Sequence, residues 1–131
     1  MKISIIVPCF NSEKTILSNL SSISSQDYKN YEVIIVDNVS NDQTINLVKK
    51  FNFKNLKIIS EKDNGIYDAF NKGISVSTGE VISHLNSDDF YCHSFVLRKV
   101  IESFSENIDA VYGNLIYVKE NNIKTKTRYW K

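Results

Sequence analysis

Short runs rich in Ile and Val alternate along the chain with longer stretches in which apolar residues recur every three or four positions. Runs of the first kind occupy residues 3–7, 31–37, 56–60 and 81–85. A run that is apolar on both faces is typical of a strand inside a parallel sheet, whereas a surface strand alternates apolar and polar residues. We therefore expect four strands at these positions, with the first two buried.

The stretches that follow these runs show the spacing of amphipathic helices. Ser12, Ser40 and Ser94 are each suited to cap the first turn of such a helix, and Gln43 completes a capping-box pattern with Ser40. The helices are expected at about residues 12–25, 40–51, 66–74 and 94–104.

Residues 110–113 form a further short apolar run, and residues 115–118 either continue it or begin a sixth strand. This regular alternation of strands with helices predicts an α/β fold with a mostly parallel sheet flanked by helices. With 131 residues, the chain is long enough to form one domain with its own core. We expect this domain to span residues 1–118, and residues 119–131 to form a tail or the start of a further part.

Composition and charge narrow the class of protein. The sequence is 42% hydrophobic and 24% charged, and its net charge of +1 does not indicate nucleic acid or an anionic membrane as the main partner. Cys9 and Cys92 show neither metal-ligand spacing nor a disulfide framework, which indicates a reducing, cytoplasmic compartment. The sequence has no signal-peptide pattern and no apolar run long enough to cross a membrane.

Polar residues follow the first, second and fourth predicted strands. They are residues 8–11, then Asp37 and Asn38, and finally residues 86–89. In an open α/β sheet, the ends of successive strands converge on one crevice, where ligands bind. Asp37 is suited to accept hydrogen bonds from a pyrimidine N–H or from ribose hydroxyls, and Phe10 is suited to contact a base.

The adjacent carboxylates of Asp88 and Asp89 repel each other unless a cation, a hydroxyl group or solvent stabilises them. Mg²⁺ and Mn²⁺ prefer oxygen ligands and commonly combine one or two carboxylates with substrate phosphates. The alternative is that both residues only cap the next turn or helix. No Gly-x-Gly-x-x-Gly or Gly-Lys-Ser/Thr motif is present, so dinucleotide binding and P-loop chemistry are disfavoured. A diphosphate bound here needs another counter-charge, and a metal at Asp88 would supply it.

Four segments together resemble the family 2 glycosyltransferases, the bacterial enzymes of the GT-A fold that build surface polysaccharides. The segments are residues 5–11, 32–44, 63–73 and 78–89, and they stand in the order expected for the family. The resemblance extends from residue 2 to about residue 115. It implies a Rossmann-like nucleotide-diphospho-sugar transferase fold, a cytoplasmic location with a peripheral position at the inner membrane as an alternative, and a role in polysaccharide or O-antigen biosynthesis.

The resemblance also implies roles for individual residues. Asn86, Ser87 and Asp88 match the family's Asp-x-Asp motif, with Asp88 as the ligand of Mn²⁺ or Mg²⁺ and Asp89 beside it. The residues expected to bind the nucleotide sugar are Pro8, Phe10, Asn11, Asp37, Asn38, Lys72, Asn86 and Ser87, and those expected at the metal are Asp88 and Asp89. For Lys72, an ion pair with Asp68 on the surface of a helix remains an equal alternative.

Two features depart from the family pattern. Asn86 replaces the first carboxylate of the motif, which predicts a lower affinity for the metal. Family members typically continue well beyond Lys131, and the carboxylate that acts as the catalytic base lies in that later part. We expect a truncated, inverting transferase that uses a donor, favoured to be UDP-linked, and a saccharide or lipid-linked acceptor. The fragment is expected to bind the donor without efficient transfer, because His84 is interpreted as a packed residue and His93 only as a neighbour of the metal or phosphate.

Other classes of protein fit less well. A receiver-type signalling domain matches in size but lacks the acidic pair, the phospho-accepting Asp and the Lys at the ends of the required strands. A nucleotidyltransferase would need a glycine-rich, basic segment after the first strand, and none is present. A non-catalytic interaction module with a vestigial donor site remains the alternative. Apolar and aromatic residues near the end of the chain predict self-association through a truncated face, or a disordered tail after about Glu120.

Overall fold

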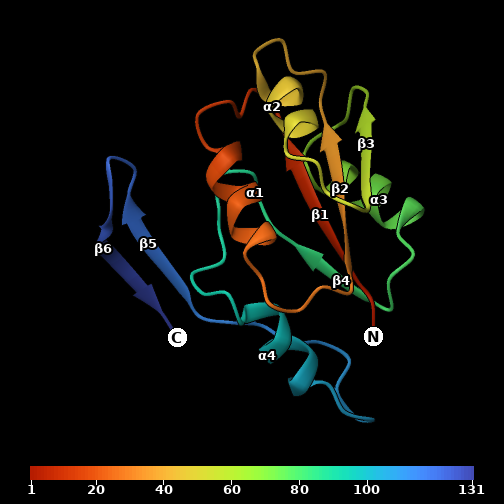
Figure 1. Ribbon diagram of the computed structural model, residues 1–131, viewed down its shortest axis with the longest axis vertical. Helices are drawn as coiled ribbons and strands as arrows, with labels where there is room; N and C mark the ends of the chain where they lie inside the picture. The colour runs from red at the N-terminus through yellow and green to blue at the C-terminus, as the bar shows by residue number, and fades with distance from the viewer. The chain divides into compact units, whose positions relative to one another are not determined.

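The computed structural model describes all residues from 1 to 131, and its larger sheet has four parallel strands in the order β3-β2-β1-β4 (Figure 1). These strands are β1 (Ile3–Cys9), β2 (Tyr31–Asp37), β3 (Leu56–Ser60) and β4 (Val81–His84). Strands β1 and β2 have a neighbour on each side, and nearly all of their residues are buried. The α/β fold and the four strands predicted from the apolar runs are confirmed.

Three helices lie between these strands in the sequence: α1 (Ile16–Ser24), α2 (Thr44–Lys50) and α3 (Ile66–Val76). Helices α1 and α2 pack against each other, whereas α3 packs on β1 and β2. Every crossover between parallel strands thus runs through a helix, as in other α/β folds. No helix in the structure has the length and apolar character that a membrane span requires.

The side of the sheet that contacts α3 has a small core of its own. Ile6, Ile34 and Val36 lie on this side because alternate residues of a strand point the same way, and they pack with Ala69 of α3. A Cβ atom at Gly73 would come within 2.5 Å of Cγ2 of Ile6. Glycine at this position therefore allows α3 to lie close to β1.

Two of the serines predicted to cap helices bond elsewhere. Helices α1 and α2 both begin later than caps at Ser12 and Ser40 would place them, and their actual cap residues make no side-chain capping bond. The Ser12 and Ser87 hydroxyls lie 2.8 Å apart, and the Ser40 hydroxyl donates to the Asp37 carboxylate. The prediction of these two caps is wrong, because groups outside the helices use the two hydroxyls, including the N–H of Asn11, which donates to Ser40.

The chain divides into two compact units, residues 1–98 and residues 99–131, and helix α4 (Val96–Ser103) spans the division. The second unit contains an antiparallel hairpin of β5 (Leu115–Lys119) and β6 (Asn122–Trp130). Each strand of this hairpin pairs only with the other.

The structure corrects two predictions for the second unit. The strand predicted at residues 110–113 is wrong, since this stretch pairs with no other strand and the fifth strand begins at Leu115. The disordered tail expected after Glu120 is also wrong. The chain turns at residues 120–121, and β6 then pairs with β5, from Lys119 opposite Asn122 to Leu115 opposite Trp130.

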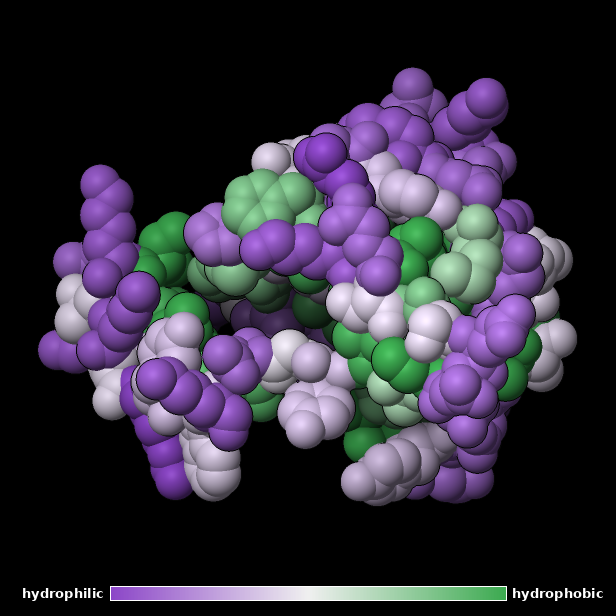
Figure 2. Space-filling view, turned by 90° about the horizontal axis from the view of Figure 1, so that it is seen from below, coloured by the Kyte–Doolittle hydropathy of each residue, from purple (hydrophilic) through white to green (hydrophobic).

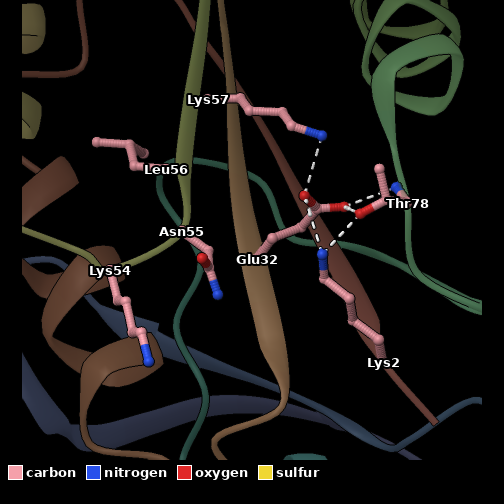
Figure 3. Close-up of a pocket in the computed structure, with 7 residues that line it drawn as sticks. All are labelled: Lys2, Glu32, Lys54, Asn55, Leu56, Lys57 and Thr78. Atoms are coloured by element: carbon pink, nitrogen blue, oxygen red, sulfur yellow. Dashed lines mark hydrogen bonds and ion pairs between the residues drawn. The ribbon is translucent and has the colours of Figure 1, made fainter.

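At the amino edge of the larger sheet, the Glu32 carboxylate of β2 is buried among partners from β1, from β3 and from the residues just before β1 and β4 (Figure 3). Its Oε2 atom pairs with the Nζ atoms of Lys2 at 3.4 Å and Lys57 at 3.1 Å. Its Oε1 atom accepts hydrogen bonds from the Ser4 hydroxyl at 2.6 Å and from the Thr78 N–H at 2.7 Å. This one carboxylate therefore ties together the starting ends of all four strands.

The same contacts set the protonation of Glu32. Burial by itself raises the pKa of this carboxyl, but hydrogen bonds from Ser4, Thr78 and Lys57 outweigh it and lower the pKa from 4.5 to about 2. A group with a depressed pKa contributes stability above its unfolded-state pKa and loses it as the pH falls through the folded-state value. The contribution of Glu32 is therefore present above pH 4.5 and is lost towards about pH 2.

We predict that Glu32→Gln lowers the free energy of unfolding at neutral pH by on the order of 3 kcal/mol, the amount that corresponds to this pKa shift. The variant should also lose much of the acid sensitivity of the parent protein in this pH range. Urea unfolding at a series of pH values measures both effects, with Glu106→Gln, at an exposed position, as the control. Equal stabilities of the parent and Glu32→Gln at neutral pH would contradict the prediction.

Candidate functional site

The carboxyl edge of the sheet brings together the three polar segments that follow β1, β2 and β4. The N–H of Asn38 donates to the carbonyl of Cys9 at 3.0 Å, and the N–H of Asn11 donates to the Ser40 hydroxyl at 2.9 Å. The contact between the Ser12 and Ser87 hydroxyls joins the first segment to the third. The convergence expected from the order of strands is therefore observed, and hydrogen bonds between the segments maintain it.

Asp37 is the buried centre of this edge, and its side chain has no exposed surface. Its carboxylate accepts hydrogen bonds from the Ser40 N–H at 3.1 Å, the Ser40 hydroxyl, the Ser60 hydroxyl at 2.7 Å and the Cys9 thiol at 3.7 Å. Burial, followed by the charge of Asp37, raises the pKa of the Cys9 thiol to about 12. Hydrogen bonds from the chain itself already use both oxygens of the Asp37 carboxylate. The predicted contact of Asp37 with a nucleotide therefore requires one of these hydrogen bonds to break.

The residues around Asp37 form an exposed rim. Phe10 is 57% exposed, so much of its surface is accessible to a ligand. Asn11 and Val39 both have left-handed backbone angles, with φ of 47° and 53°, which are uncommon outside glycine and mark a sharply turned loop. The Oδ1 atom of Asn38 accepts a hydrogen bond from the N–H of Asp63, which ties the loop after β3 to the same rim.

Pro8 lies within β1 rather than on the rim, and it is buried. A proline in a central strand is unusual because it has no N–H to donate to the ladder. Here β4 ends at His84, opposite Ile6, so Pro8 lies beyond the part of β1 that pairs with β4. The sheet is thus open on this side of β1.

The predicted metal ligands lie on a tight turn after β4. The N–H of Asp89 donates to the carbonyl of Asn86 at 3.0 Å and closes the turn, and the side chains of Asp88 and Asp89 are exposed. Asp89 is exposed overall, but neighbouring atoms partly desolvate its carboxyl, and this desolvation, followed by the charge of Asp88, raises the pKa of Asp89 above its ordinary range. Asn19 of α1 donates two hydrogen bonds to the backbone of this turn, although no pattern in the sequence singles this residue out.

The residues on this turn fit a divalent cation that is shared with a ligand. No group of three or more His, Cys, Asp and Glu side chains converges in the structure in the way a metal site built from protein alone requires. Asp88 and Asp89 offer two neighbouring, accessible carboxylates, and their mutual repulsion would be relieved by a cation. Two carboxylates completed by phosphate oxygens are a common arrangement for Mg²⁺.

Lys72 makes contacts within its own neighbourhood. Its Nζ atom donates to the carbonyl of Lys62 at 2.6 Å and pairs with Glu61 at 3.2 Å and Asp68 at 3.5 Å. Although desolvation opposes the charge, the hydrogen bond from Lys72 to Glu61 leaves the pKa of Lys72 above its ordinary value. The ion pair with Asp68 that the sequence suggested is thus present, and Lys72 also holds the loop after β3.

Neither histidine has the contacts of a catalytic base. His84 stacks on Phe70, with ring centroids 3.9 Å apart, and burial lowers its pKa. His93 stacks on Phe95 at 4.9 Å. His84 is thus packed against Phe70 through its ring, as interpreted from the sequence, but the residue as a whole is exposed rather than buried within the strand.

Comparison with known proteins identifies relatives of this chain. The profile of the family described as "Glycosyl transferase family 2" matches residues 4–131. A β-1,3-glucosyltransferase of Escherichia coli, WfgD, is 31% identical over 125 residues, which cover 95% of this chain and 49% of the relative. The glycosyltransferase AglE of Haloferax volcanii is 32% identical over 132 residues, which cover 97% of this chain and 43% of the relative. The chain spans less than half the length of either relative.

Solved structures with a similar fold contain nucleotide sugars. The crystal structure of TarS from Staphylococcus aureus in complex with UDP-GlcNAc superposes with a TM-score of 0.73 at 34% identity, over 78% of this chain and 30% of that chain. The mannosyltransferase PcManGT of Pyrobaculum calidifontis, in complex with GDP-Man and Mn²⁺, has a TM-score of 0.75 at 25% identity, over 81% of this chain and 33% of that chain.

We predict that Asp37→Asn lowers the free energy of unfolding by about 1–3 kcal/mol. The substitution replaces one carboxylate oxygen, which accepts hydrogen bonds, by an N–H₂ group that faces the same donors and cannot accept from them. Urea unfolding measures this change, with Asp109→Asn, at an exposed position, as the control. Hydrogen exchange should also become faster at the N–H of Ser40, which Asp37 holds. Unchanged stability together with unchanged exchange would contradict the role assigned to Asp37.

Proposed function

The chain belongs to glycosyl transferase family 2, and on that premise we propose that it forms the nucleotide-sugar-binding part of an inverting glycosyltransferase. The observation that carries the proposal is the linkage of three polar segments at the carboxyl edge of the sheet, with the accessible carboxylates of Asp88 and Asp89 beside them. In an α/β sheet this is the edge at which nucleotides bind.

The donor that we propose is a sugar linked to uridine diphosphate. Support comes from the similarity to TarS, whose structures contain UDP-GlcNAc or UDP, and to WfgD, which is named for UDP-Glc. The exposed ring of Phe10 offers a surface for the base, while the polar atoms of Asn11 and Asn38 border the same rim. Asp37 acts mainly by holding this loop in place.

The proposed site also accounts for the charge of the donor. A divalent cation, when bound, stabilises the negative charge that develops on the leaving diphosphate. Asp88 is proposed as the protein ligand of the cation, with Asp89 beside it, and Asn86 and Ser87 face the sugar or the phosphates. Asn86 brings no charge, so the protein alone holds the cation weakly and the diphosphate contributes the remaining ligands.

The acceptor part of the reaction is proposed to depend on residues beyond Lys131. An inverting transfer requires a base that takes the proton from the attacking hydroxyl. Both histidines are stacked on phenylalanines, so we assign the base to the remaining part of the enzyme. A saccharide or lipid-linked acceptor in polysaccharide biosynthesis is proposed from WfgD, whose name specifies a diphosphoundecaprenol-linked sugar. Such an acceptor is compatible with a cytoplasmic protein that works at the surface of the inner membrane.

We predict that the chain binds UDP more tightly in the presence of Mn²⁺ and that Asp88→Ala weakens this metal-dependent binding by about tenfold or more, since it removes the main protein ligand of the cation. Isothermal titration calorimetry with and without Mn²⁺ measures the effect, and Asp109→Ala is the matched control. Absence of UDP binding at any concentration of Mn²⁺ would contradict the proposal and favour a non-catalytic interaction module with a vestigial site.

We also predict that the chain self-associates through the hairpin, whose large apolar side chains are about half exposed or more. Figure 2 shows that hydrophobic areas lie open among hydrophilic ones on one face of the molecule. The exposed hairpin residues are Leu115, Tyr117, Ile123, Tyr129 and Trp130. Light scattering after size-exclusion chromatography should give a mass that rises with concentration, and Leu115→Asp should reduce this rise. Leu17→Asp, at an exposed position of α1, is the control. A constant monomer mass at high concentration would contradict the prediction.

A further inference from the structure

A stripe of polar side chains runs along α1 and its C-terminal end, beside the stripe that packs in the core. It consists of Asn19, Ser22 and Gln26, at the i, i+3 and i+7 spacing that places residues on one side of a helix. Asn19 and Gln26 have no exposed surface at all. Two fully buried amides on one side of a surface helix require partners, because buried polar groups are costly when unpaired.

The partners are backbone groups of one segment, the residues between β4 and α4. The Nδ2 atom of Asn19 donates to the carbonyls of Asn86 at 2.8 Å and Asp89 at 2.9 Å. The N–H of Tyr91 donates to the Ser22 hydroxyl at 3.0 Å. The stripe thus binds the segment at successive points in chain order, beginning at the turn with the two carboxylates.

Gln26 binds the far end of the same segment. Its Nε2 atom donates to the carbonyl of His93 at 2.6 Å, and its Oε1 atom accepts the N–H of Leu97 at 3.0 Å. Leu97 lies in the first turn of α4, so Gln26 satisfies an N–H that a capping residue otherwise serves. The carbonyl of Ser94 also accepts the N–H of Asp27, which joins the same end of α1 to the residues before α4.

Asn19 is matched to its partners in a way that an apolar residue cannot reproduce. Both hydrogens of its amide point to carbonyl oxygens, so only an N–H₂ group suits this place. Its Oδ1 atom is buried and has no hydrogen-bond partner in the structure. An unpaired buried oxygen is destabilising, so the amide has a cost at this position. The two bonds that Asn19 donates to the turn are the contacts that offset this cost.

We propose that Asn19 is a positioning residue for the carboxylates of Asp88 and Asp89. It holds the carbonyls on both sides of Asp88, so the backbone of the turn is fixed while the side chain stays free to bind a cation. Ser22 and Gln26 hold the rest of the segment, and Gln26 secures the start of α4. This inference rests on the proposed function of the carboxyl edge, and the following experiment separates the two.

The test compares Asn19→Leu with Gln26→Met. Each substitution keeps the approximate shape of the side chain and removes its hydrogen-bonding amide group. Three readouts are used: the melting temperature, amide hydrogen exchange over residues 86–97, and UDP titration with and without Mn²⁺. Both variants should melt at a lower temperature than the parent. Asn19→Leu should speed exchange at the N–H of Asp89 by about tenfold or more, and Gln26→Met should do so at the N–H of Leu97.

The two variants should differ in ligand binding. Asn19→Leu should weaken the Mn²⁺-dependent part of UDP binding by about fivefold or more, whereas Gln26→Met should leave it within about twofold of the parent. If each variant lost UDP affinity only in proportion to its loss of stability, the proposal would be overturned, because a general structural role of both residues predicts that result. Unchanged affinity in Asn19→Leu would overturn it as well.

Two further outcomes are distinguishable. If the parent chain binds no UDP with Mn²⁺, the proposed function fails, and the exchange pattern alone decides whether Asn19 holds the turn. If Asn19→Leu does not fold, Asn19→Asp replaces it, since this variant has the same shape but directs an oxygen towards the two carbonyls. Its exchange should then be faster at Asp89, and unchanged exchange would overturn the proposal.

Discussion

The buried carboxylate of Asp37 is the interaction on which the carboxyl edge of this sheet depends. It accepts hydrogen bonds from Ser40, Ser60 and Cys9, groups that follow or belong to three different strands. The same strand carries a second buried carboxylate, Glu32, at its other end, and two lysines neutralise that one. The two ends of β2 are thus built differently: the amino edge is a closed ionic cluster, whereas Asp37 is satisfied by hydroxyl, thiol and amide donors alone.

The elements of the sheet were predictable because burial leaves a clear mark on sequence. The Ile and Val runs of β1 and β2 correspond to strands with neighbours on both sides. Helix starts were less predictable, since a serine beside a helix is read as a cap whether or not another segment uses its hydroxyl. Ser12 and Ser40 illustrate this: their hydroxyls connect loops that are distant in sequence, to Ser87 and to the N–H of Asn11. The strand expected at residues 110–113 failed for a related reason, because apolar character does not provide the partner that a strand requires.

The candidate site was predictable in part. Its segments could be placed at one edge from the order of strands, and Asp88 and Asp89 stood out as adjacent carboxylates after a strand. The support from α1 was not predictable. Asn19 and Gln26 bind backbone carbonyls and N–H groups of residues 86–97, and backbone groups leave no signature in the sequence. The hydrogen bonds of Asp37 within the protein were not predictable either. An aspartate at the end of a strand gives the same sequence pattern whether its carboxylate binds a ligand or groups of its own loop.

The central claim is that this edge binds a nucleoside diphosphate together with a cation at Asp88, as part of a longer glycosyltransferase. The most direct measurement is a crystal structure of the chain soaked with UDP and Mn²⁺, with anomalous diffraction used to locate the metal. The account predicts an anomalous peak between the diphosphate and the carboxylate of Asp88, with the uracil ring beside Phe10 and the loop after β2. A nucleotide bound at another edge of the sheet, or a diphosphate at this edge with the metal away from Asp88, would contradict it.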